Sequence, residues 1–178
     1  MGKEIGRQLG LQGYTVILAS RDTDAGEKTR DELVAMGCDA HTVTLDVTNA
    51  DDIGKVVNYL EQNFAKLDIL VNNAGVALEW DGNPTNTDKI RRTLEVNLIA
   101  PYAITEALIP LLSRSEDARV INQSSLLGSI GTAEHAWDQV SYFMTVGYST
   151  SKAGLNMLTQ IQSKTLMDKG ILVAASHP

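Results

Sequence analysis

The sequence predicts an α/β protein in which helices cover both faces of a parallel sheet. Short apolar runs rich in β-branched residues, such as residues 14–20 (YTVILAS), alternate along the chain with segments of helical periodicity. This alternation indicates successive βαβ units and therefore a doubly wound parallel sheet. The apolar runs suit strands that are buried on both faces.

Five segments are predicted to be helices. The first carries Ile5 and Leu9 on one face, and Gly37 stops the second. Apolar residues of the third, from Ile53 to Phe64, recur at helical spacing. Pro101 should bend or restart the long fourth helix, because proline removes a backbone donor. The predicted helices cover residues 2–11, 24–36, 53–64, 87–112 and 148–168.

Five shorter segments are predicted to be strands. In the second of them Val43 and Leu45 point to one side, as the period of a strand requires. Ligands of such folds bind beyond the carboxyl ends of the strands, where most of the candidate motifs below are found. The predicted strands cover residues 14–20, 41–45, 67–71, 119–123 and 171–175.

Length and composition favour one soluble domain over residues 1–178. The net charge of -7, without a basic stripe, argues against nucleic acid and anionic membranes as partners. Cys38 is the only cysteine, which excludes an internal disulfide and fits a reducing compartment. We find no signal pattern and no apolar run approaching the ~20 residues that span a bilayer. The cytoplasm is therefore the expected location.

Two strand ends carry candidate ligand contacts. Asn72–Gly75 (NNAG) follow the strand of residues 67–71, and small residues there let the backbone approach a ligand. The alternative is an ordinary polar turn. Asp46 follows another strand, where its carboxylate could accept a hydrogen bond from an adenine amino group. Asp46 could equally cap the helix that begins after Thr48.

The end of the first predicted strand indicates which dinucleotide would bind. In dinucleotide folds an acidic residue at this place binds the ribose 2′-hydroxyl, whereas a nearby arginine accommodates a 2′-phosphate. Here Arg21 follows Ser20 as the first charge, with Asp22 after it. The pattern favours NADP over NAD, the alternative being a solvated loop arginine.

Tyr148 and Lys152 open the last predicted helix, four residues apart. Positions i and i+4 share a helix face, so the phenol and the ammonium should point into the same cleft. A nearby ammonium favours the phenolate, which makes a tyrosine usable as a general acid or base. A surface pair without a role has the same spacing.

Two further polar residues lie near this cleft in the predicted fold. The hydroxyl of Ser125, after the strand of residues 119–123, could hold a carbonyl oxygen as charge develops on it, or serve a turn. Asn97 lies inside a helix, where Asn is a poor former, and so could bond backbone or water in the cleft or be a satisfied buried side chain. Ser125 lacks a Gly-x-Ser-x-Gly elbow, which argues against a hydrolase. The histidines show no metal-ligand spacing, so we expect no metal site.

Taken together, these segments resemble the short-chain dehydrogenase/reductase family, with a Rossmann-type doubly wound sheet. The matches follow the family's order: Asp46, Asn72–Gly75, Asn97, Ser124–Ser125, Tyr148 with Lys152, and Pro178. The resemblance implies a catalytic tetrad of Asn97, Ser125, Tyr148 and Lys152. It also implies cofactor contacts from Gly2, Arg21, Asp46, Val47, Asn73, Ala74, Gly75, Tyr148, Lys152 and Pro178.

The resemblance implies a mechanism in which nicotinamide supplies or accepts a hydride. Tyr148 passes a proton to or from the substrate oxygen, and Ser125 positions that oxygen. Lys152 tunes Tyr148 and binds the nicotinamide ribose. Asn97 holds a water that links Lys152 to solvent.

The chain departs from the family's pattern at both ends. Gly2 matches the last glycine of the family's glycine-rich turn, and the first strand before that turn is absent. Beyond Pro178 the family continues with another strand and a substrate-binding loop. We therefore expect an incomplete copy of a larger enzyme, with a gap at the centre of its sheet.

Ser125 and Tyr148 are 23 positions apart, which is longer than in most of the family. The extra residues, around 130–145, include Trp137, Tyr142 and Phe143. This resembles the carbonyl-reductase branch, whose members tend to be NADPH-dependent and monomeric. A lengthened surface loop of no consequence is the alternative.

The expected function is that of an NADP(H)-dependent oxidoreductase that interconverts a small-molecule carbonyl and an alcohol. A non-catalytic redox sensor that binds a dinucleotide is one alternative, although the filled tetrad argues against it. A relative of the nucleotide-sugar epimerases and dehydratases is another. Asn72–Gly75 and the short chain argue against that class.

Overall fold

Five parallel strands form two sheets in residues 1–177, which are the residues that the computed structural model describes. Strands β1 and β2 make one sheet, and β3, β4 and β5 make the other, in that spatial order. The chain divides accordingly into unit 1, Met1–Leu60, and unit 2, Glu61–Pro178. That the whole chain acts as one catalytic domain stays a prediction.

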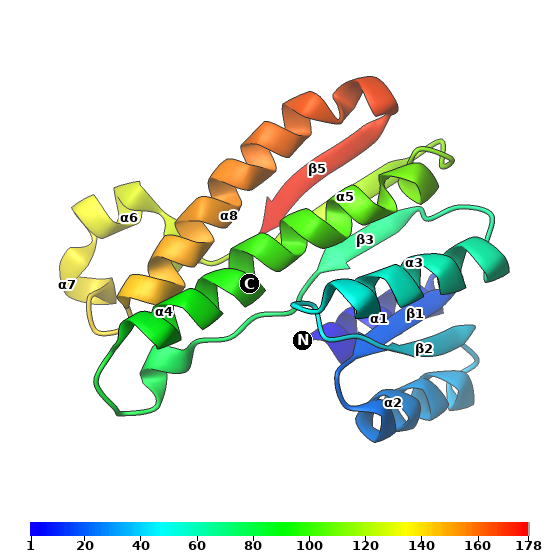
Figure 1. Cartoon of the computed structure of the whole chain (residues 1–178), viewed down its shortest axis with the longest axis horizontal. Coiled ribbons are helices and arrows are strands. Elements are labelled where there is room, and N and C mark those ends of the chain that lie inside the picture. Colours follow the sequence, from blue (N-terminus) through cyan, green and yellow to red (C-terminus); the bar gives the residue numbers. More distant parts are fainter. Residues whose placement is uncertain (178) are drawn as a thin grey trace. The chain divides into compact units, whose positions relative to one another are not determined.

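Unit 1 is built from helices packed on the two-stranded sheet (Figure 1). Val16 pairs with Ala40 and Ser20 with Thr44 in the parallel register. A small apolar core lies between the sheet and the helices: Val16, Leu33, Cys38 and Ala40, with Leu9 and Leu18 packed against it. The elements are α1 (Gly2–Leu11), β1 (Val16–Ser20), α2 (Thr23–Ala35), β2 (Ala40–Thr44) and α3 (Ala50–Asn63).

Glycine lets α1 pack closely against this core. A Cβ atom on Gly10 would lie 2.8 Å from both Cβ and Sγ of Cys38. Real Cβ atoms do not approach other atoms so closely, so the helix could sit there only with a glycine at this position.

Unit 2 carries helices over the three-stranded sheet, with α5 and α8 packed along it (Figure 1). Its strands are β3 (Ile69–Asn72), β4 (Ala118–Gln123) and β5 (Ile171–Ser176). Its main helices are α4 (Thr87–Leu94), α5 (Ala100–Leu112) and α8 (Val146–Thr165). The short helices α6 (Ile130–His135) and α7 (Trp137–Val140) lie in the segment before α8.

The run from Thr87 to Leu112 is continuous, because a π-helical segment, Glu95–Ile99, joins α4 to α5. The sequence predicted a bend or restart near Pro101. The irregularity ends two residues before Pro101, which occupies the second position of α5, where proline is tolerated. By length and mean hydropathy alone, this run is also long and apolar enough to cross a membrane. Three polar residues of this run, Thr93, Asn97 and Thr105, are buried.

The predicted fold class is confirmed, and each predicted helix and strand is present within about three residues of its expected bounds. The differences lie in the connections. The short helices α6 and α7 were not foreseen, because four to six residues carry too little periodicity to reveal a helix. The described strands also form two sheets, one of two strands and one of three.

The packing of α1 predicts opposite effects for two Gly→Ala changes in unit 1. We expect Gly10→Ala to lower the free energy of unfolding by about 1–3 kcal/mol, because the new methyl group meets Cys38. Gly54→Ala, in α3, has open space around its Cβ and should raise that free energy by about 0.4–1 kcal/mol. Urea denaturation of both variants measures the two effects. An equal response of the two would contradict the close packing of α1.

Candidate active site

Helix α8 brings Tyr148 and Lys152 together at the carboxyl end of β4. Lys152 is only 4% exposed, and its Nζ donates a hydrogen bond of 2.6 Å to the carbonyl oxygen of Gln123, the last residue of β4. The same Nζ lies 5.7 Å from the centroid of the Tyr148 ring. The predicted placement of both groups on one face of the helix is therefore present in the structure.

Burial gives Lys152 unusual chemistry for a lysine. Removal from water disfavours the charged form and lowers the pKa of Lys152 from its ordinary value. An ammonium has three protons to donate, and the Gln123 carbonyl takes one of them. The others are available to hydroxyl groups of a ligand.

Asn97 fixes the backbone at Val76, in the segment after β3, by hydrogen bonds to its amide and carbonyl. It is fully buried in the π-helical segment, a kind of irregularity frequent at functional sites. Its Oδ1 accepts a hydrogen bond from the Val76 amide at 2.8 Å, and its Nδ2 donates to the Val76 carbonyl at 2.9 Å. Nδ2 also donates to Ser151 Oγ at 3.0 Å. Asn97 thus ties the segment after β3 to α8.

The two ends of the Asn72–Gly75 turn have different roles: Asn72 packs in the core, and Gly75 lies beside Lys152. Nδ2 of Asn72 donates to Thr105 Oγ1 and to Asn122 Oδ1 inside the core, so this side chain holds the sheet to α5. Gly75 lies at the other end of the turn, where a Cβ would stand 3.4 Å from Asn97 Oδ1 and 3.7 Å from Lys152 Nζ. A larger side chain at position 75 would fill space beside the ammonium.

Ser125 follows β4 directly and begins a short 3-10 turn, Leu126–Gly128. Its Oγ accepts a hydrogen bond of 3.2 Å from the Leu127 amide. The turn packs tightly on α8, because a Cβ on Gly128 would lie 2.6 Å from the carbonyl carbon of Lys152. Ser125 is therefore held beside the turn of α8 that carries Lys152.

The predicted cofactor residues of unit 1 lie where its strands end and where α1 begins. Gly2 is the first residue of α1, and the side chain of the N-cap residue, Met1, makes no capping hydrogen bond. Arg21 is exposed just after β1. Asp46 accepts hydrogen bonds from the amide and the hydroxyl of Thr48, and these hold the pKa of Asp46 below its usual value, with a smaller contribution from the Arg21 charge. Val47, half-buried, follows it.

The alternative reading of Asp46 as a helix cap is wrong in detail. Asn49 accepts hydrogen bonds from the amides of Asp51 and Asp52 at the start of α3, while Asp46 forms a turn with Thr48. Pro178, the remaining predicted cofactor contact, lies outside the described residues.

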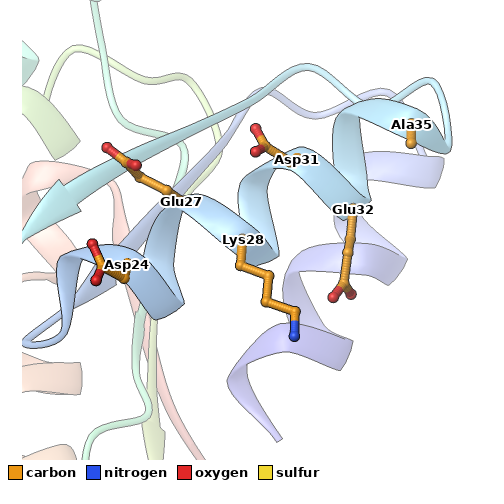
Figure 2. A pocket seen from close by; sticks show the side chains of 6 residues that line it. All are labelled: Asp24, Glu27, Lys28, Asp31, Glu32 and Ala35. Atoms are coloured by element: carbon orange, nitrogen blue, oxygen red, sulfur yellow. The ribbon is translucent and has the colours of Figure 1, made fainter.

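A hollow on the surface of α2 contains none of the predicted site residues. Figure 2 shows its lining, which is mostly acidic: Asp24, Glu27, Lys28, Asp31, Glu32 and Ala35. Four carboxylates beside one ammonium would repel the phosphates of a dinucleotide. This hollow is therefore no candidate for a cofactor site.

Two residues that the sequence did not single out contact Tyr148. The centroid of the Trp80 ring lies 5.0 Å from that of Tyr148, and the rings are tilted by 42°. The carboxylate of Glu79 accepts a hydrogen bond from the Tyr148 amide. Neither residue ends a strand or lies on a long helix, so no pattern in the sequence marked them.

Comparison with known proteins identifies relatives for the whole chain. The family model described as short chain dehydrogenase matches residues 1–178. The chain is 29% identical to an uncharacterized oxidoreductase, YxjF, of Bacillus subtilis (strain 168), over all of this chain and 65% of that protein. It is 31% identical to (+)-neomenthol dehydrogenase of Arabidopsis thaliana, over 77% of this chain and 54% of that one.

A solved structure is similar over the same length. The crystal structure of a metagenomic short-chain oxidoreductase in complex with NADP has a TM-score of 0.83 and 29% sequence identity. The match covers 99% of this chain and 76% of that chain. The chain thus spans about half to three quarters of the length of the proteins that it matches.

The hydrogen bonds of Asn97 predict an effect of a nearly isosteric substitution. Asn97→Asp replaces the donating amide by an oxygen, so the Val76 carbonyl and Ser151 Oγ lose their donor inside the core. We expect the free energy of unfolding to fall by about 2–4 kcal/mol at pH 7, measured by urea denaturation. Asn58→Asp, on the exposed side of α3, is the matched control and should change it by less than about 0.5 kcal/mol. A tolerated Asn97→Asp would contradict the assigned amide orientation.

Proposed function

Because the chain belongs to the short chain dehydrogenase family, we propose that it binds a nicotinamide dinucleotide and interconverts a carbonyl and an alcohol. One observation carries the proposal: the buried Lys152 ammonium, bonded to the end of β4, lies against the ring of Tyr148. The named relatives and the solved neighbour are oxidoreductases, which supports the reaction class.

The residues present fit such a cofactor within each unit. In unit 2, Gly75 leaves open space beside Lys152, and the free ammonium protons suit the hydroxyl groups of a ribose. In unit 1, the side chain of Met1 makes no capping hydrogen bond to α1, so the amides of Gly2 and Lys3 at the start of the helix could bind a phosphate. Asp46 is ionised and can accept a hydrogen bond from an adenine amino group.

The nicotinamide, when bound, would supply or accept the hydride. Tyr148 would donate the proton that the new alcohol oxygen needs, or remove it in the reverse direction. The positive charge of Lys152 would stabilise the phenolate that remains. The hydroxyl of Ser125 would donate a hydrogen bond to the substrate oxygen as negative charge develops there.

Asn97 would act by holding the site together. Both protons of its side-chain amide are engaged by Val76 and Ser151, so its contribution is to fix the backbone beside Lys152. The water that the resemblance assigns to Asn97 stays a prediction.

Arg21 supports NADP(H) as the preferred form of the cofactor. Its guanidinium is exposed at the end of β1, where a 2′-phosphate would be read. The solved neighbour with a TM-score of 0.83 is itself a complex with NADP.

Exposed aromatic side chains favour an apolar carbonyl compound as substrate. Trp80 packs on Tyr148 and remains 49% exposed, and its Nε1 donates to the carbonyl of Phe143, whose ring is also exposed. Phe143 belongs to the segment before α8 that resembles the carbonyl-reductase branch. An apolar substrate could therefore cover Trp80 and Phe143 while its carbonyl reaches Tyr148.

We further propose that the protein is a monomer and that it is located in the cytoplasm.

Removal of the phenol hydroxyl tests the proton-transfer role. We expect Tyr148→Phe to lower kcat for carbonyl reduction by about 10²–10⁴-fold, while the Kd for NADPH changes less than about threefold. Steady-state kinetics and fluorescence titration measure the two quantities. Tyr102→Phe, on the exposed face of α5, is the matched control and should leave both unchanged. Normal turnover in Tyr148→Phe would exclude Tyr148 as the acid or base.

Cofactor choice is tested by removing one guanidinium. We expect Arg21→Ala to weaken NADPH binding by about tenfold or more and to leave NADH binding nearly unchanged, because only NADPH carries the 2′-phosphate. Arg30→Ala, which removes an arginine of α2 paired with Asp31, should affect neither Kd. Equal weakening for the two cofactors in Arg21→Ala would show that Arg21 does not read the phosphate.

A further inference from the structure

The helix that carries Tyr148 begins at Val146 without a capping hydrogen bond from the side chain of its own N-cap residue. Thr145 occupies the N-cap position of α8, yet its side chain makes no capping hydrogen bond to the helix. N-cap side chains ordinarily serve the amides of the second and third helical residues, which in α8 are Gly147 and Tyr148. These amides donate instead to Glu79 Oε2, at 2.7 Å and 3.0 Å, across 68 and 69 positions of the chain.

Glu79 is held in the ionised form at this place. It is only 8% exposed, and burial by itself would raise the pKa of its carboxyl group. The hydrogen bonds that the carboxylate accepts outweigh burial and hold the pKa of Glu79 below its usual value. One of them comes from Thr85 Oγ1 at 3.2 Å. The negative charge stands at the positive end of the α8 dipole, where it stabilises the helix.

Gly147 is a second observation that the start of α8 accommodates the Glu79 side chain. A Cβ at this position would lie 2.8 Å from Glu79 Oε2 and 3.2 Å from Cα of Ile90. Only a glycine leaves room for the carboxylate to reach the first turn of α8. The helix start thus provides space for this cap as well as donors.

The residue after Glu79 contacts the same tyrosine through its ring. Trp80 packs against the Tyr148 ring with a centroid separation of 5.0 Å. The indole is held in turn by its Nε1, which donates to the Phe143 carbonyl at 3.2 Å. Adjacent residues therefore fix Tyr148 at its backbone and at its aromatic ring.

We propose that Glu79 is a positioning residue, which caps α8 from another segment and so sets where the Tyr148 phenol stands. The kinetic part of this inference rests on the proposed function. The structural part does not, because the Trp80 contact can be followed without turnover.

The kinetic test compares the loss of this cap with the loss of an equal cap elsewhere. We expect Glu79→Ala to lower kcat at least tenfold, with the KM for the carbonyl substrate and the Kd for NADPH within about threefold of the wild type. Glu79→Gln keeps an oxygen that can accept from the same amides, so it should recover most of kcat. Asn86→Ala is the matched control: Asn86 accepts from the amides of Asp88 and Lys89 at the start of α4, and its loss should leave kcat within twofold.

A spectroscopic test uses Trp80 itself, in a Trp137→Phe background where it is the only tryptophan. Glu79→Ala should shift the Trp80 emission to longer wavelength, because the indole loses its contact with Tyr148 and gains water. Glu79→Gln and Asn86→Ala should leave the emission unchanged. Should Glu79→Ala fold too poorly to measure, Gly147→Ala displaces the same carboxylate and should lower kcat and shift the emission in the same directions.

Three results would overturn the inference: an unchanged kcat in Glu79→Ala, an equal loss in Asn86→Ala, or no recovery in Glu79→Gln. A wild-type protein that binds NADPH but reduces no carbonyl would refute the proposed function alone. The emission of Trp80 would then decide the matter, since an unshifted spectrum in Glu79→Ala contradicts the positioning role.

Discussion

The arrangement of unit 2 depends on a lysine ammonium taken out of water at the end of a strand. A buried charge is costly unless it is hydrogen-bonded, and the Gln123 carbonyl provides that bond for Lys152. The surrounding backbone must then come close. Gly75 approaches the ammonium from the turn after β3, and Gly128 lets the turn after β4 pack against the backbone of α8. Substitutions at Gly75 or Gly128, although far from Tyr148 in the sequence, would therefore disturb the backbone around Lys152.

Much of the fold and of the candidate site could be predicted from the sequence, because the relevant patterns are local. The strand ends at Asn72–Gly75 and Ser125, and the four-residue spacing of Tyr148 and Lys152, are short patterns whose geometry follows from parallel strands and helices. The bond from Lys152 to the Gln123 carbonyl was not predicted, because it joins residues 29 positions apart. Asn97 stood out because asparagine is unusual within a helix, although its partners, Val76 and Ser151, could not be foreseen.

What the sequence concealed depends on contacts between distant segments. Glu79 lies 69 positions before Tyr148, in a short 3-10 turn without periodicity, and looks like any surface glutamate. The absence of a capping side chain at Thr145 was equally hidden, since threonine is an ordinary N-cap residue. The amino-acid composition of the π-helical segment does not distinguish it from an α-helix, and the segment keeps the run through α4 and α5 continuous. Such features become visible only when the partner segment is in place.

The thiol of Cys38 gives unit 1 a property of its own. It is the only sulfhydryl in the chain, it is buried, and α1 passes so close that a Cβ on Gly10 would lie 2.8 Å from the sulfur. A thiol-specific reagent should therefore react with it mainly in molecules in which the core of unit 1 has opened locally. The labelling rate would count those transient openings in unit 1 alone, and would do so without a fluorophore or any ligand.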